Sequence, residues 1–306
     1  KVALQHNLSD DVMVYGSYTT AVKAGGVNAG DNPTKYDPEK AGVLDFGLKS
    51  ILMDGSMLLN MNVLNAQNDG FLIAAVVNTG TQNRNIDAEF TGFEGNMMWF
   101  SSETTKLEAN WLFLDHEVAS DTMLIDYLNP TGTPLVALGS APDAFGVVTM
   151  ALDPSTGGVF FKSAGYNCSV PFAFTTGCPG VEGYAQSIKG NNLPGSSDES
   201  YGLSITQDIN ARNGVTSMRL SYRYRGEADL SIFNTPRAKI DSQSTMDLLV
   251  RYTPNSDDWY AGVFVKNLRD QQHINALREN SNVGGGALLG AFTDPRIYGI
   301  EFGAKF

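Results

Sequence analysis

The sequence has 306 residues, of which 42% are apolar and 18% are charged, and its formal net charge is -12. This balance excludes an intrinsically disordered chain, and the acidic charge argues against a nucleic acid as partner because phosphate binding needs a basic surface. No run of about eighteen uncharged apolar residues occurs, which excludes a transmembrane helix.

Eleven segments alternate apolar with polar or small side chains, which is the pattern of a β-strand whose two faces meet different surroundings. In chain order they are residues 1–8, 12–22, 40–52, 56–75, 84–100, 104–120, 198–210, 215–232, 243–253, 258–272 and 294–306. In the eighth segment, Leu220 and Tyr222 alternate with Arg219, Arg223 and Arg225. Arginines are not buried without partners, so their face must meet water or carboxylates. Such strands are typical of a wide transmembrane β-barrel with a wet interior.

The last predicted strand places its aromatic and aliphatic residues on one face and ends on an aromatic residue. Tyr298, Ile300, Phe302 and Phe306 share this apolar face. A strand that ends the sequence in this way is typical of a barrel in lipid, where the apolar face meets acyl chains and aromatics lie at the interface. We therefore predict that these four residues form the signal for insertion into the outer membrane.

The connections between the predicted strands have two very different lengths. Short turns lie near residues 9–11, 53–55, 101–103, 211–214 and 255–258, whereas residues 25–39, 76–83, 120–194, 233–243 and 273–293 form long loops. Short turns at one end and long loops at the other are typical of outer-membrane barrels, with tight periplasmic turns and large extracellular loops.

Eleven is an odd number, and the usual bacterial barrel closes with an even number of strands. Either one strand is miscounted, or the chain is part of a larger barrel. The second interpretation is favoured because the sequence begins directly on a predicted strand. We predict an all-β, antiparallel transmembrane barrel architecture for residues 1–306.

Two cysteines, Cys168 and Cys178, lie within the long extracellular loop predicted at about residues 120–194. Their spacing in a Gly-, Ser-, Thr- and Pro-rich loop predicts a disulfide in an oxidising compartment, with two free thiols as the alternative. A metal site would need more ligands than these, and the three histidines are scattered. We therefore expect neither a metal nor a cofactor.

Five motifs, in the same order along the chain, resemble motifs of the TonB-dependent outer-membrane receptors. They are Tyr15-Gly16-Ser17-Tyr18 with residues 23–28; Tyr36-Asp37-Pro38-Glu39 with residues 46–50; residues 85–94; Val265-Lys266-Asn267-Leu268-Arg269-Asp270; and Pro295-Arg296 with Tyr298-Gly299 and Phe306. The chain departs from the family pattern at Asp45, where the family usually has glutamate.

This resemblance implies that the chain supplies the carboxyl-terminal half of a 22-stranded barrel. It also implies import of scarce ligands too large for porins, powered by TonB, ExbB and ExbD. The plug domain and the TonB box are missing from the sequence, so we expect the contact with TonB to lie outside this chain. Outer-membrane lipid and the barrel-assembly machinery are the other partners that the resemblance implies.

The long loops above the lumen are the expected ligand-binding surface, because binding residues concentrate on such loops. The candidate ligand-binding residues are Tyr127, Tyr166, Phe172 and Tyr184 in the loop at 120–194, together with Arg219 and Arg223 in the lumen. Guanidinium groups suit a carboxylate or phosphate ligand. The aromatic loop equally fits a disulfide-stapled cap, and the arginines equally fit ion pairs with acidic residues of the plug or of neighbouring strands.

The sequence contains no arrangement of residues that predicts catalysis. In Asp115-His116-Glu117, strand alternation places His116 on the face opposite the two carboxylates. We therefore expect a receptor-transporter of the Gram-negative outer membrane and not an enzyme. The alternative is a passive channel or an adhesin-type barrel, and the ligand stays open among a siderophore, haem, cobalamin and an oligosaccharide.

Overall fold

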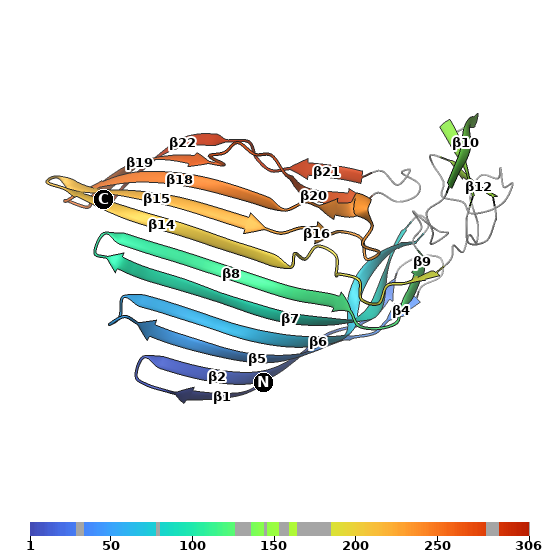
Figure 1. Ribbon diagram of the computed structural model, residues 1–306, viewed down its shortest axis with the longest axis horizontal. Coiled ribbons are helices and arrows are strands. Elements are labelled where there is room, and N and C mark those ends of the chain that lie inside the picture. The colour runs from blue at the N-terminus through green and yellow to red at the C-terminus, as the bar shows by residue number, and fades with distance from the viewer. Residues whose placement is uncertain are drawn as a thin grey trace.

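The computed structural model describes residues 1–28, 34–77, 80–125, 136–143, 146–152, 159–163, 185–279 and 288–305. One antiparallel sheet of eleven strands dominates it (Figure 1). In spatial order, which is also chain order, the strands are β1 (Val2–Asn7), β2 (Val12–Lys23), β5 (Glu39–Leu52), β6 (Met57–Val77), β7 (Gly80–Ser102), β8 (Thr105–Val118), β14 (Glu199–Ala211), β15 (Gly214–Arg225), β18 (Gln243–Pro254), β19 (Trp259–Lys266) and β22 (Ile297–Ala304). The eleven predicted strands are confirmed.

Smaller sheets form within the long connections. They are the pairs β3 (Gly26–Asn28) and β4 (Thr34–Tyr36), β9 (Met123–Ile125) and β13 (Ala185–Ser187), β16 (Ala228–Asp229) and β17 (Lys239–Ile240), β20 (Ile274–Glu279) and β21 (Leu288–Phe292), and the triple β10 (Val136–Asp143), β11 (Gly146–Leu152) and β12 (Val159–Ser163). A 3₁₀-helix, η1, covers Pro236–Ala238. No helix in the described ranges is long and apolar enough to cross a membrane.

Short and long connections alternate along the main sheet, as predicted. Figure 1 shows the short turns gathered at one end of the sheet, where β1 meets β2 and β5 meets β6, and the long connections at the opposite end. One predicted loop is wrong: residues 76–83 are largely strand, because β6 runs to Val77 and β7 begins at Gly80. This hairpin extends past its neighbours at the long-connection end.

Two predicted strands end earlier than expected. The strand predicted at 215–232 ends at Arg225, after which the Gly226 N–H donates to the Glu199 carbonyl and the chain turns away. The strand predicted at 258–272 ends at Lys266, because Asn267 and Asp270 adopt positive φ angles of 49° and 55°. Residues in that conformation cannot continue a strand.

The outward face of the sheet, defined by Tyr298, Ile300 and Phe302, is apolar from strand to strand. These three side chains are 69%, 85% and 70% exposed. The register aligns an apolar row across eight strands: Met57, Trp99, Leu107, Ile205, Leu220, Leu248, Val265 and Tyr298. A continuous exposed apolar surface of this kind is the lipid-facing surface of a transmembrane barrel.

Aromatic side chains gather toward both ends of this apolar band. Near the short turns, the Trp259 ring lies 5.7 Å from that of Tyr252 and 6.1 Å from that of Phe302. Toward the long connections, Tyr201 stacks on Tyr224 with ring centroids 4.9 Å apart. Two aromatic girdles bounding an apolar band are the arrangement expected at the two interfaces of a bilayer.

The inward face of the sheet, opposite the outward face, is mostly polar. One row across seven strands consists of Lys49, Asn60, Asn96, Asn110, Gly202, Arg223 and Thr245. Glycines on this face make room for aromatic rings from the next strand. A Cβ atom added at Gly299 would lie 2.1 Å from Cζ of Phe264, so the ring of β19 lies directly over β22. This packing explains why the last strand alternates apolar residues with glycine.

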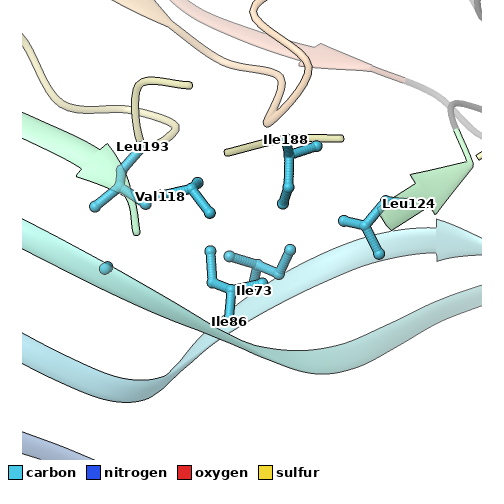
Figure 2. Close-up of a cluster of buried hydrophobic side chains, with 7 residues drawn as sticks. Ile73, Ile86, Val118, Leu124, Ile188 and Leu193 are labelled. Carbon is cyan, nitrogen blue, oxygen red and sulfur yellow. The ribbon is translucent and has the colours of Figure 1, made fainter. Parts of the chain in front are cut away.

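The buried apolar core in the described ranges lies at the long-connection end of the sheet and not along its strands. Its members are Ile73, Ile86, Ala88, Val118, Leu124, Ile188 and Leu193 (Figure 2). Backbone hydrogen bonds from Gly190 N to Val118 O and from Val118 N to Asn191 O, both 2.9 Å, hold the segment 188–193 against β8. This core anchors the end of the long loop to the rim of the sheet.

A second rim structure is the turn after β19, which contains the predicted Asn-Leu-Arg-Asp motif. The buried Asn267 side chain donates to the carbonyls of Gln271 and Asp294 at 2.8 and 3.0 Å. The Arg296 backbone N–H donates to Asp270 Oδ1 at 2.9 Å, and the Arg296 guanidinium pairs with Oδ2 at 3.1 Å. The motif therefore joins the end of β19 to the beginning of β22.

This turn makes a pH-dependent contribution to stability. The Arg296 N–H, followed by the Arg296 charge, holds the pKa of Asp270 below its ordinary value of 3.8. A lowered carboxyl pKa stabilises the fold above the ordinary value and loses that effect as the pH falls through the lowered one. We expect protection of the Arg296 amide against hydrogen exchange, relative to its intrinsic rate, to be constant down to about pH 3.8 and to fall below it. In Asp270→Asn, protection that still falls over this range would contradict the assignment.

Candidate functional site

A cluster of carboxylates and an amide lies on the inward face of β2, β5, β6 and β7. Asn62 Nδ2 donates to Asp45 Oδ1 at 3.0 Å and to Glu94 Oε1 at 3.1 Å. Both hydrogens of the amide group are thereby used. The Tyr15 hydroxyl donates to the same Asp45 oxygen at 3.5 Å. We call these four residues the inward carboxylate cluster.

The register of the sheet assembles this cluster from four strands. Tyr15 pairs with Gly47, Gly47 with Asn62, and Asn62 with Glu94. Gly47 has no side chain, and a Cβ there would lie 2.3 Å from the Tyr15 ring. The ring therefore lies across β5, and its hydroxyl reaches Asp45.

The carboxylates of the cluster lack a cationic partner. Among the residues that the structure describes, no Lys, Arg or His forms an ion pair with Asp45 or Glu94. The Lys49 ammonium group lies nearby, 5.8 Å from the centre of the Tyr15 ring. Lys1 and Lys49 line the same hollow as Asp45, so the carboxylates of the cluster form no ion pair but have cations nearby.

The inward face of β8, β14, β15, β18 and β22 is different, because three of its arginines are paired with carboxylates within the wall. Arg219 Nη1 lies 2.5 Å from Glu108 Oε2, and its Nη2 donates to Ser204 Oγ at 2.9 Å. Arg223 pairs with Asp247 at 2.5 Å. In the same way, Arg251 Nη2 lies 2.6 Å from Glu301 Oε1. The sequence placed Arg219 and Arg223 on one face, but only the register reveals their acidic partners, Asp247 on the neighbouring β18 and Glu108 on β8, two strands away.

His116 has a structural place at the rim. Its side chain is buried at 2% exposure, and Nδ1 accepts a hydrogen bond from the Leu193 N–H at 3.0 Å. Nε2 lies 3.4 Å from Asp198 Oδ1. His116 therefore holds the loop end that also contributes Leu193 to the core.

Several predicted site residues lie outside the described residues. They are the aromatic ligand-binding candidates Tyr127, Tyr166, Phe172 and Tyr184, the cysteines Cys168 and Cys178, and the terminal Phe306. Of the predicted insertion signal, Tyr298, Ile300 and Phe302 lie exposed on the outward face. Within the described ranges no group of three or more His, Cys, Asp and Glu side chains is placed to hold a metal ion.

Solved structures with the same fold are receptors and transporters by their titles. The ferric yersiniabactin uptake receptor FyuA from Yersinia pestis is similar over 98% of this chain and 36% of its own, with 15% identity and a TM-score of 0.67. The siderophore receptor PiuA from Acinetobacter baumannii matches 98% of this chain and 34% of its own (13% identity, TM-score 0.62). The copper transporter OprC matches 98% of this chain and 38% of its own, with 12% identity and a TM-score of 0.60.

This chain therefore spans about a third of the length of the solved structures that it matches. No curated protein matches its sequence. A comparison with protein families matches residues 1–268 to the family described as TonB dependent receptor-like, beta-barrel. With its antiparallel sheet, apolar outward face and polar inward face, the chain belongs to this family of outer-membrane β-barrel receptors.

Proposed function

We propose that the full-length protein is a Gram-negative outer-membrane receptor that imports a scarce, large ligand with energy supplied through TonB, ExbB and ExbD. The observation that carries this proposal is the inward carboxylate cluster. Carboxylates that face a lumen without forming ion pairs are free to bind a positively charged partner. We propose that this partner is a plug domain of the same receptor, with basic side chains that meet Asp45 and Glu94.

The contrast between the two parts of the inward face supports a plug with a defined orientation. Asp45 and Glu94 form no ion pair with another described residue, whereas Arg219 and Arg223 are paired with Glu108 and Asp247. A passive channel needs only a hydrated lumen, and an adhesin-type barrel needs only its loops. Carboxylates that face the lumen without an ion pair favour a barrel that holds a cationic element inside it.

For the ligand we propose a ferric siderophore, because FyuA is described as a ferric yersiniabactin uptake receptor and PiuA as a siderophore receptor. Haem, cobalamin and oligosaccharides are the other candidates. Arg219 and Arg223 remain candidate ligand contacts, since their side chains are 38% and 65% exposed despite their ion pairs. Tyr127, Tyr166, Phe172 and Tyr184 are the candidates on the extracellular loop, with a Cys168–Cys178 disulfide as its staple. The barrel-assembly machinery and outer-membrane lipid are the proposed partners in assembly, and no catalytic activity is proposed.

The test is uptake by cells that carry the intact gene. We expect a strain lacking the receptor to lose growth on one member of a panel of ferric siderophores, haem, cobalamin and oligosaccharides supplied singly. Plasmid-borne receptor should restore growth in cells with TonB but not in cells without it. Restored growth that is equal with and without TonB would support the passive channel and contradict the receptor. If the strain that lacks the receptor grows normally on every member of the panel but adheres poorly to surfaces, the adhesin-type barrel would be supported.

A further inference from the structure

Three cations lie on the inward face of the sheet where β15 and β19 end. Arg223 and Arg225 are two residues apart on β15, so they share its inward face, and Arg225 is its last residue. Lys266 is the last residue of β19 and shares the inward face of Phe264. Both strands run from the short turns toward the long connections, so these residues lie at the mouth of the lumen (Figure 1). We call them the mouth cations.

Asp247 is the carboxylate beside the mouth cations, and it forms an ion pair with one of them. Its Oδ2 lies 2.5 Å from Arg223 Nη2. The register that pairs Leu248 with Val265 brings Lys266 level with Asp247. Even so, Lys266 forms no ion pair with any residue that the structure describes. Its ammonium group is therefore available to a ligand.

Arg225 also lacks a carboxylate partner among the described residues, and its Nη2 donates to the Gly195 carbonyl at 3.2 Å. A guanidinium group has five N–H donors, so most of them stay available. Arg223 likewise uses one donor for its carboxylate, and its side chain is 65% exposed. Asp198, at the same rim, lies 3.4 Å from His116 Nε2. The mouth cations therefore form a positively charged patch in an acidic chain.

The arginine that lies deeper in the lumen is held differently. The three side-chain nitrogens of Arg219 all have partners in the wall, which are Glu108, Ser204 and Ser221. A ligand that entered the lumen would meet the free donors of the mouth cations first. The charge of the ligand is therefore sensed at the mouth.

We propose that the mouth cations select an anionic iron chelate, an inference that rests on the receptor function proposed above. Ferric catecholates and hydroxycarboxylates carry net negative charge, whereas ferric tris-hydroxamates are neutral. Guanidinium and ammonium groups donate charge-assisted hydrogen bonds to anionic oxygens. Arg223 exchanges Asp247 for the chelate, and Arg225 and Lys266 contribute their free donors. A neutral chelate gains little from these charges.

Asp247 weakens the binding of an anion, because its charge repels the ligand and occupies Arg223. It also accepts the Asn267 N–H at 2.9 Å, which ties it to the turn after β19. Asp247→Asn keeps an oxygen for that hydrogen bond, removes the charge and frees Arg223. We expect this variant to bind an anionic chelate several times more tightly. Damage to the fold would weaken binding and could not produce this gain.

The experiment is calorimetric titration of the full-length receptor in detergent with a ferric tris-catecholate and a ferric tris-hydroxamate of similar size. We expect the catecholate to bind more tightly. Arg225→Gln and Lys266→Gln should each weaken its binding about tenfold, the effect of one charge-assisted hydrogen bond. Neither variant should change any binding of the hydroxamate.

Arg269→Gln is the matched control, because it removes the same charge at the same rim from the outward face. The Arg269 guanidinium lies 5.7 Å from the centre of the outward-facing Tyr222 ring. The control should leave catecholate binding unchanged, and heat-modifiable gel migration checks that each variant folds.

The outcomes separate this inference from the receptor function. Equal binding of the two chelates, an equal loss in Arg269→Gln and Lys266→Gln, or weaker binding by Asp247→Asn would overturn the selection of anions and leave the receptor proposal standing. Binding of neither chelate would also overturn this inference. The growth panel, which includes haem, cobalamin and oligosaccharides, would then decide the receptor function on its own.

Discussion

Replacing Met97 by arginine is expected to prevent the stable insertion of the barrel. Met97 lies on the outward face of β7, in a row with Leu59 and Ala109 on the neighbouring strands. A cation on the lipid face of a barrel costs about 2–4 kcal/mol near the bilayer midplane. A cost of that size is a large fraction of the stability of a folded protein. The measurement is the denaturant midpoint of the full-length receptor folded into lipid vesicles.

The matched control changes the adjacent residue. Asn96 faces inward, opposite Asn60 and Asn110, and no charged residue is its direct cross-strand partner. Asn96→Arg adds the same side chain one position away, but places it in the hydrated lumen. We expect its midpoint to stay close to that of the unaltered receptor. Equal destabilisation by the two variants would mean that the outward and inward faces are not distinguished by lipid, against the assignment made here.

Neutralising the inward carboxylate cluster is expected to open the pore to large solutes. The double variant Asp45→Asn, Glu94→Gln keeps the shape of both side chains and removes both charges. If cationic plug residues meet these carboxylates, removing one partner of such an interfacial charge pair costs about 2–5 kcal/mol. A cost of about 3 kcal/mol corresponds to more than a hundredfold change in the equilibrium between a seated and a displaced plug. The measurement is sensitivity to a bulky antibiotic that an intact outer membrane excludes.

The comparison variant for this experiment is Asp10→Asn, which removes a carboxylate from the exposed turn between β1 and β2. It should leave antibiotic sensitivity unchanged. Comparable amounts of each receptor in the outer membrane exclude a general defect in assembly. Unchanged sensitivity in the double variant, at normal receptor amounts, would show that the plug is held by other contacts.

Much of the fold can be predicted from the alternation of apolar and polar residues alone, because one face of each strand meets lipid and the other meets water. Tyr298, Ile300 and Phe302 were placed on one face by their spacing, and they lie exposed on the outward face. The strand ends were harder to predict. Asn267 ends β19 through a positive φ angle. Nothing in the pattern of apolar and polar residues marks this position as the end of the strand. The tip of the hairpin between β6 and β7 was predicted as a loop because its polar residues obscure the pattern.

The inward face was predicted as polar, but its chemistry depends on contacts between strands. Arg219 and Arg223 could be placed in the lumen from period-two spacing. Their pairing with Glu108 and Asp247 joins residues far apart in the sequence, and a one-residue change of register would break it. The contact of Asn62 with Asp45 and Glu94 has the same origin. The sequence marked Asp45 only as a departure from the family pattern, and nothing in it joined Asp45 to Asn62 and Glu94.

The order of the main sheet leaves β1 and β22 with a hydrogen-bonded neighbour on one side only. Along these two seams, peptide groups would meet acyl chains in any partly assembled state, at a cost of several kcal/mol for each unsatisfied group. Strands therefore cannot enter the bilayer and wait there one at a time. Pairing of these strands with their neighbours and insertion into lipid are therefore expected to occur together.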